Sequence, residues 1–218
     1  MNISSLWQTI RILLPGLQYT LGLFAITLVL SLPLGLLLAF GASRERGMCK
    51  GIIRGYVALM RGTPLMLQLF FVYFGLPVLP WIGTYLRMNR FPAACVAFVL
   101  NYAAYFCEIF RGGLLAVDRG QYEAATVLRL GKLRTKLTIA VPQMCKVTLP
   151  AVSNEVITLV KDTALGSVLS IPDLMKLANA RVNATASIVP FVVAAIFYLL
   201  MTMVLTRGFS ALEKKFKF

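Results

Sequence analysis

The sequence predicts an all-α membrane protein with five transmembrane helices, an N-terminus outside and a C-terminus in the cytoplasm. The first observation is composition: hydrophobic residues make up 59% of the 218 residues and charged residues 14%, whereas a soluble domain is about half apolar and about a quarter charged. The second is distribution, because most basic residues flank long apolar segments. Arginine and lysine in that position are typical of the cytoplasmic side of membrane proteins.

The first membrane span is predicted at residues 15–42. This stretch contains no charged residue and exceeds the roughly 20 residues that a spanning helix needs. Residues 1–14 precede it and place several apolar side chains on one helical face beside Trp7. An apolar face with a tryptophan is typical of a helix in the membrane interface. We therefore expect a short interfacial helix before the first span.

Two further spans are predicted at residues 51–76 and 91–115. The sequence RGTP at residues 61–64 interrupts the second span, and its proline predicts a kink because it removes a helical hydrogen bond. The connection to the third span contains Trp81 and two prolines, and we expect it to lie outside.

A polar loop at residues 118–148 follows the third span. We expect the fourth span at residues 149–172, an external connection at residues 173–187 and the fifth span at residues 188–206. The basic residues 211–218 are expected to form a cytoplasmic tail.

The positive-inside rule sets the orientation of this transmembrane domain, residues 15–210. The cytoplasmic side receives the larger basic set: Arg44, Arg46, Lys50, Arg54, Arg111, Arg119, Arg129, Lys132, Arg134, Lys136, Lys146, Arg207, Lys214, Lys215 and Lys217. The outside receives the smaller set: Arg11, Arg87, Arg90, Lys176 and Arg181. The reverse orientation would place the larger set outside, so we reject it.

The net charge of +14 is explained by this topology rather than by a nucleic-acid partner. No basic stretch is interleaved with exposed aromatic residues, and the chain has no histidine. The cysteines, Cys49, Cys95, Cys107 and Cys145, form no CxxC pair. We therefore expect reduced thiols, no metal site and no bound nucleic acid.

Polar residues at helical spacing on the third and fourth spans predict a path for a zwitterionic solute. The candidate path residues are Asn101, Tyr105, Glu108, Asn154, Glu155 and Thr158. On the fourth span, Asn154 and Lys161 are expected to share the face of Thr158, with the two acidic residues on the neighbouring face.

Arg61, Lys161 and Asp162 have two open interpretations. A charge at membrane depth costs roughly 2.5–3.5 kcal/mol on insertion scales, so it usually faces the interior of the bundle. These residues either neutralise other charges and hold the helices together, or line the same path. Ion pairs of Arg61 with Glu108 or Asp162 are compatible with their depths.

The polar loop carries the densest charge in the chain and predicts a short amphipathic helix at residues 122–130. Gly131, Pro142 and Pro150 follow this helix and predict that it ends and that the chain turns. A polar helix between two membrane spans is suited to docking a soluble partner.

Glu123-Ala124-Ala125, with Pro142 closing the segment, resembles the EAA loop of ABC-importer permeases. In that family the helix fits a groove on a cytoplasmic ATPase subunit. The family usually has glycine six residues after the glutamate, where this chain has Arg129. We expect a turn of different shape, because only glycine adopts positive φ without strain. The resemblance assigns ATPase coupling to Gly120, Tyr122, Glu123, Ala124, Ala125, Leu128, Arg129, Gly131 and Pro142.

Three other sequence blocks are similar to the polar amino-acid branch of these permeases. They are RGTPL at residues 61–65 with QLF at 68–70, EIFRGG at 108–113, and KDT at 161–163 with Leu165. The resemblance covers about residues 15–210 and implies the type I importer fold and an amino-acid cargo. It also implies a second permease subunit, a pair of ABC ATPases, an extracytoplasmic solute-binding protein and a bacterial cytoplasmic membrane.

The chain contains no phosphate-binding sequence of the form GxxxxGK[ST], so ATP and Mg²⁺ are expected on the partner ATPase and no cofactor on this chain. An enzyme is not expected, because the chain offers no histidine and few acidic residues. Two alternatives remain. The importer carries a different small polar solute, such as a sulfur amino acid or an opine, or the chain is a membrane channel, although no repeated filter is visible.

Overall fold

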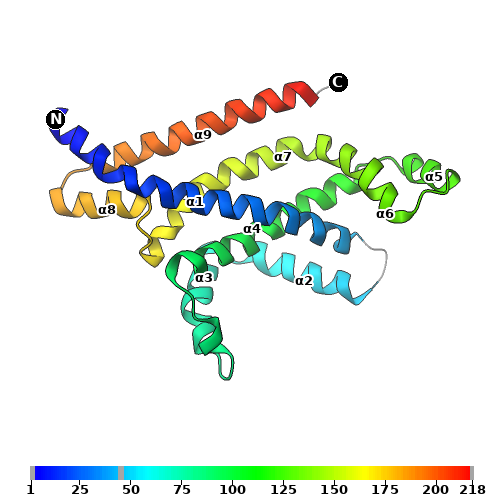
Figure 1. Cartoon of the computed structure of the whole chain (residues 1–218), viewed down its shortest axis with the longest axis horizontal. Coiled ribbons are helices and arrows are strands. Elements are labelled where there is room, and N and C mark those ends of the chain that lie inside the picture. Colours follow the sequence, from blue (N-terminus) through cyan, green and yellow to red (C-terminus); the bar gives the residue numbers. More distant parts are fainter. Residues whose placement is uncertain (1–2, 44–46, 217–218) are drawn as a thin grey trace.

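The chain forms an elongated helical bundle, seen in a computed structural model that describes residues 3–43 and 47–216 (Figure 1). No β-strand occurs among these residues. The predicted cytoplasmic residues Arg44, Arg46 and Lys217 lie outside the described part of the chain. The long helices run along the length of the bundle, with short helices at both ends (Figure 1).

Helix α1, Ile3–Ala42, continues without a break through Pro15 and Pro33. The separate helix predicted at residues 1–14 is therefore wrong for the described residues, which form the first turns of α1. A proline removes one backbone hydrogen bond, but in an apolar environment every other unpaired backbone group is costly, and this favours a continuous helix. The position of these turns at the membrane interface stays a prediction.

Helix α4, Arg90–Leu115, lies at the centre of the bundle. In the most apolar stretch of each helix, 67% of α4 is buried, against 28% of α1 and 17% of α9, Val189–Phe216. Small residues allow α1 and α4 to approach closely. A Cβ atom on Gly35 would lie 2.6 Å from the Cβ of Phe106, which is the small-residue packing common between membrane helices.

The predicted second span is broken rather than kinked. Helix α2, Met48–Gly62, and helix α3, Leu65–Phe70, meet at a bend of 107°. Thr63 and Pro64 are both extended, because the proline ring disfavours a helical conformation in the residue before it. The chain then continues through a π turn, Phe71–Gly75, and two 3₁₀ turns, Leu76–Val78 and Gly83–Leu86, and this arm leaves the bundle (Figure 1).

The polar loop contains helix α5, Arg119–Val127, which begins and ends three residues before the predicted limits. Asp118 caps its N-terminus by accepting a hydrogen bond from the Gly120 N–H at 2.7 Å. The turn after α5 occurs at Arg129, with φ of 54°, and not at Gly131, which is extended. The prediction that Gly131 makes the turn is wrong.

Helix α7, Val141–Asp162, starts well before the predicted fourth span. It follows helix α6, Lys132–Thr135, and a π turn, Lys136–Ala140. The turn predicted at Pro142 is absent, because this proline sits in the first turn of α7, where its missing N–H is tolerated. Pro150 lies inside α7 without ending it.

The C-terminal part contains one helix that was not predicted. After the 3₁₀ turn Thr163–Leu169, helix α8, Leu174–Thr185, occupies the predicted external connection and packs against α1 and α9. Helix α9 then runs to Phe216, so the predicted tail is helical as far as that residue.

Within the described chain, three helices are long and apolar enough to cross a membrane: α1, α4 and α9. The bent pair α2–α3 makes a fourth if it is counted as one span. The all-α class is confirmed, and the polar helix α7 is not in this set.

Candidate functional site

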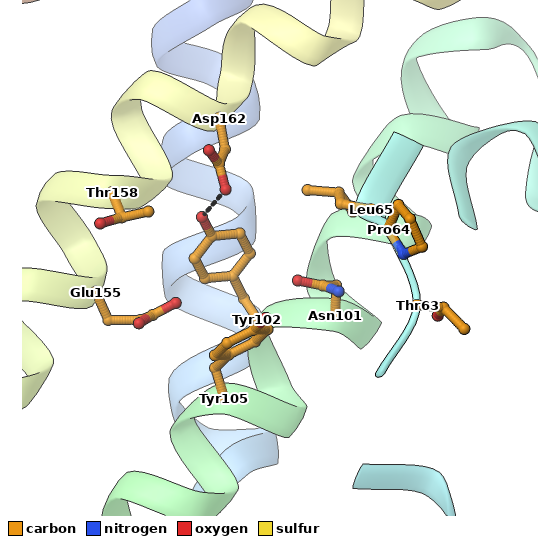
Figure 2. A pocket seen from close by; sticks show the side chains of 9 residues that line it. All are labelled: Thr63, Pro64, Leu65, Asn101, Tyr102, Tyr105, Glu155, Thr158 and Asp162. Carbon is orange, nitrogen blue, oxygen red and sulfur yellow. Dashed lines mark hydrogen bonds between the residues drawn. The ribbon is translucent and has the colours of Figure 1, made fainter. Parts of the chain in front are cut away.

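A cavity of about 300 Å³ lies where the α2–α3 break faces α4 and α7 (Figure 2). Its walls come from parts of the chain far apart in the sequence. The lining residues are Thr63, Pro64, Leu65, Asn101, Tyr102, Tyr105, Glu155, Thr158 and Asp162. Four of the six predicted path residues are among them.

The α4 wall braces the break between α2 and α3. The Asn101 side-chain N–H₂ donates to the Gln68 amide oxygen at 3.0 Å and to the Met60 carbonyl at 3.1 Å. Gln68 in turn donates to the Met60 carbonyl at 2.9 Å and to the Thr63 hydroxyl at 2.8 Å. The end of a helix leaves carbonyls without partners, and these two amides satisfy one of them where α2 stops. The predicted path residue Asn101 therefore also shapes the cavity wall.

The α7 wall presents Glu155, Thr158 and Asp162, which recur at i, i+3 and i+7 and so share one helical face (Figure 2). Asn154 and Lys161 are exposed on another face. The expectation that Asn154 and Lys161 share the cavity face with Thr158 is therefore wrong. The acidic residues, expected on a neighbouring face, are the ones that face the cavity.

The two walls are joined by a hydrogen bond across the cavity. The Tyr102 hydroxyl donates to the Asp162 carboxylate at 2.7 Å (Figure 2). Asp162 therefore pairs with the Tyr102 phenol. It does not form the ion pair with Arg61 that the depths of the two residues allow. Sequence reasoning missed Tyr102, because an aromatic residue among alanines predicts a buried packing residue, and Tyr102 is indeed almost fully buried.

Glu108 does not line the cavity and lies one helical turn beyond it along α4. Its carboxylate accepts two hydrogen bonds from Arg111, at 3.0 and 2.7 Å. Arg61 approaches the same carboxylate at 4.0 Å and places its guanidinium 5.3 Å from the centre of the Tyr105 ring. The Arg61–Glu108 pair, the other allowed pair, is present. Lys161 makes no ion pair with the part of the chain that the structure describes.

The cavity lining carries two carboxylates and no basic residue. Carboxylates form strong charge-assisted hydrogen bonds with ammonium and guanidinium groups, and phenol rings attract cations. The arrangement can therefore hold a small solute that carries a positive charge. Among the described residues, no group of three or more Cys, Asp or Glu side chains is placed to hold a metal ion.

Helix α5 separates the predicted coupling residues into anchors and an outward face. Ala125 is buried, and Tyr122 is half-buried with its hydroxyl 3.5 Å from the Leu114 carbonyl at the end of α4. Burial raises the pKa of the Tyr122 hydroxyl. Glu123 points outward. The other outward residues of the predicted set are Gly120, Ala124, Leu128, Arg129, Gly131 and Pro142.

Two exposed apolar residues near this face were missed by sequence reasoning. Val127 is 83% exposed and Leu133 is 68% exposed, close to Leu128 at 70%. Val127 lies inside the helix predicted at residues 122–130, but a single valine there carries no sequence signal for a docking role.

Arg129 occupies the left-handed position in the turn that ends α5. The Arg129 N–H donates to the Thr126 carbonyl at 2.9 Å, and the Leu130 N–H donates to the Ala125 carbonyl at 2.9 Å. These two bonds form a Schellman motif, in which glycine usually holds the left-handed position. Arginine adopts that conformation here, so positive φ is kept without glycine.

Comparison with known proteins gives one consistent result. Residues 31–218 match the sequence model of a family described as "Binding-protein-dependent transport system inner membrane component". The chain is 36% identical over 218 residues to the arginine transport system permease protein ArtQ of Bacillus subtilis (strain 168), covering 100% of this chain and 98% of that protein.

Two further similarities extend this result. The chain is 37% identical to the octopine transport system permease protein OccM of Rhizobium radiobacter, over 95% of this chain and 87% of that protein. Its fold is similar to a chain of a solved structure titled "Crystal structure of an amino acid ABC transporter with histidines", with a TM-score of 0.86, 30% identity and 99% coverage of both chains.

Proposed function

The chain belongs to the family of binding-protein-dependent transport inner membrane components, and from that premise we propose that it is the amino-acid permease of an ATP-driven importer whose cargo passes the α4–α7 cavity. Members of this family are translocation subunits of the bacterial inner membrane and not enzymes, and the ATPase is a separate partner. The observation that carries the proposal is the cavity lining, with Glu155 and Asp162 facing Tyr105 and Asn101 across a space of about 300 Å³.

The acidic lining favours an amino acid with a cationic side chain. Binding a cation between two carboxylates is favourable, whereas a second negative charge there would be repelled. The names of two relatives, an arginine permease and an octopine permease, agree with a polar amino-acid or opine cargo. We therefore rank arginine and lysine before neutral and acidic amino acids.

We propose five membrane crossings, formed by α1, the bent pair α2–α3, α4, α7 and α9. Helix α7 is polar, but its acidic residues face the cavity and not the lipid, as intramembrane charges usually do. The N-terminal end of α2, helices α5 and α6, and the C-terminal end of α9 lie at the same end of the bundle (Figure 1). This end carries most of the basic residues, which supports a cytoplasmic C-terminus and an outside N-terminus.

Helix α5 is proposed as the surface that docks on the ATPase. Its anchors, the half-buried Tyr122 and the buried Ala125, hold it against the end of α4, while Glu123 and Leu128 remain available to a partner. A movement of the ATPase pair would pass through α5 to α4 and, through α6, to α7, the two helices that form the cavity walls. The assembly proposed contains a second permease subunit, an extracytoplasmic solute-binding protein, and ATP with Mg²⁺ on the ATPase.

Uptake into proteoliposomes tests this function. The complex of permease and ATPase is reconstituted with ATP inside and binding protein outside, and radiolabelled arginine, lysine, glutamine, cystine and glutamate are compared. ATP-dependent accumulation of arginine or lysine, with little glutamate, supports the proposal. Accumulation that does not depend on ATP would point to a channel, and preference for cystine to the sulfur amino-acid alternative.

A further inference from the structure

We propose that Arg61 is the gate residue of the cavity on its cytoplasmic side, an inference that rests on the proposed import function. The guanidinium of Arg61 lies between the Tyr105 ring, 5.3 Å away, and the Glu108 carboxylate, 4.0 Å away. Tyr105 lines the cavity and Glu108 does not. Arg61 therefore ties the last turn of α2 to α4 next to the cavity.

The contact of Arg61 with Tyr105 and Glu108 lies at the end of the cavity that is nearer to helix α5. Along α4, Glu108 follows Tyr105 in the direction of α5. Along α2, Arg61 precedes Thr63 and Pro64, which line the cavity, and so lies toward the basic cytoplasmic loop. A solute leaving the cavity toward the cytoplasm must pass this level of the bundle.

The chemistry of the contact suits a bond that opens and closes. The Arg61 and Glu108 side chains are 44% and 25% exposed, so their attraction is modest and partly screened. When Arg61 leaves, Glu108 keeps its two hydrogen bonds to Arg111. The opened state therefore contains no unpaired carboxylate, which would otherwise make opening costly.

Arg61 also connects the gate to the occupant of the cavity. Its guanidinium lies over the ring of Tyr105, and Tyr105 and Glu155 line the same cavity. A cation bound in this cavity weakens the attraction that holds Arg61 there, because like charges repel. Binding of a cationic amino acid and release of Arg61 are thus linked, while a neutral occupant leaves that attraction unchanged.

The test measures ATP hydrolysis by the reconstituted complex of permease and ATPase, first without binding protein and amino acid and then with both. Loss of the gate removes one restraint on the resting state. Arg61→Gln is expected to raise the unstimulated rate by roughly two- to fivefold, the factor that a partly exposed ion pair can carry, and to reduce the stimulation by arginine. Glu108→Gln and Tyr105→Leu are expected to act in the same direction.

The matched control is Lys161→Gln, which removes an exposed cation of α7 that lies outside the cavity and the gate. Its unstimulated rate is expected to equal that of the wild type. A monodisperse Arg61→Gln complex with wild-type unstimulated and stimulated rates would overturn the proposal. If Arg61→Gln yields no folded complex, Tyr105→Leu decides, because an unchanged unstimulated rate in that variant contradicts the gate equally.

These outcomes are separate from those of the proposed function. If the wild-type complex shows no stimulation by any amino acid with its binding protein, the importer function fails, whatever Arg61 does. If the wild type is stimulated and Arg61→Gln behaves as the wild type does, only the gate fails.

Discussion

The walls of the α4–α7 cavity are held by residues far apart in the sequence, whereas helix α5, the proposed docking helix, is held largely by contacts within one short segment. Tyr102 and Asp162 are 60 residues apart, and Asn101 and Gln68 are 33 apart. By contrast, Asp118 caps α5 two residues away, and the Schellman motif closes between Ala125 and Leu130. Substitutions in the cavity should therefore affect stability and transport together, while those on the outward face of α5 should affect only docking.

The largest effect is expected from Glu123→Arg, which reverses a charge on the outward face of α5. Folded yield should be unchanged, while co-purification with the ATPase is lost and uptake falls by more than about tenfold, because a like charge at an interface suppresses binding. Glu213→Arg, a reversal on α9, is the control. A Glu123→Arg subunit that still co-purifies and transports normally would show that α5 is not the docking surface.

The next effect is expected from Tyr102→Phe in the cavity wall. The change leaves Asp162 without the hydrogen bond from the phenol, so the free energy of unfolding should fall by about 1–3 kcal/mol and arginine uptake should fall with it. Thermal unfolding in detergent and initial uptake rates measure the two effects. Tyr105→Phe keeps the ring beneath Arg61 and should be milder. If Tyr102→Phe loses uptake but keeps wild-type stability, the hydrogen bond contributes to transport and not to folding.

A smaller effect is expected from Arg129→Gly at the end of α5. The left-handed conformation costs a residue with a side chain about 1 kcal/mol or more, so glycine should stabilise the turn and slow hydrogen exchange of the α5 amides. Gly131→Ala, at an extended position, should have little effect. Faster exchange in Arg129→Gly would mean that the arginine side chain contributes more than its backbone strain costs.

The smallest effect is expected from Asn154→Ala. Asn154 is exposed away from the cavity, and a surface change of this kind is usually within about 0.5 kcal/mol. Initial uptake rates should match the wild type, whereas Thr158→Val, on the cavity face, should lower them. An uptake defect in Asn154→Ala with normal folding would return this residue to the path and contradict the assigned face of α7.

A long apolar run predicted the limits of the central helix well. The third span was predicted at residues 91–115, and α4 is Arg90–Leu115. Helix α8 was missed because its sequence is polar enough to resemble a connection and its burial depends on α1 and α9. The 107° break was predicted only as a kink, because a proline signals an interruption but not the angle that Gln68 and Asn101 then stabilise.

The cavity could be predicted in part. Periodicity on α4 brought Asn101 and Tyr105 to one side, and both line the cavity. On α7 the predicted path contained Glu155 and Thr158, which line the cavity, and Asn154, which does not, while Lys161 and Asp162 were left open between two roles. Periodicity groups the residues that share a face of α7, but which face meets α4 depends on how the two helices pack. The spacing of Glu108 and Arg111 was a local signal for their ion pair that sequence reasoning did not use.

The claim that this cavity binds the transported cation is tested most directly by equilibrium binding of radiolabelled arginine to the purified permease–ATPase complex. The wild type should bind arginine saturably, and unlabelled lysine should compete while glutamate should not. The double variant Glu155→Gln/Asp162→Asn should bind at least about tenfold more weakly, because it loses both charge-assisted contacts. Equal affinity in the wild type and a folded double variant would contradict the account and place the binding site elsewhere.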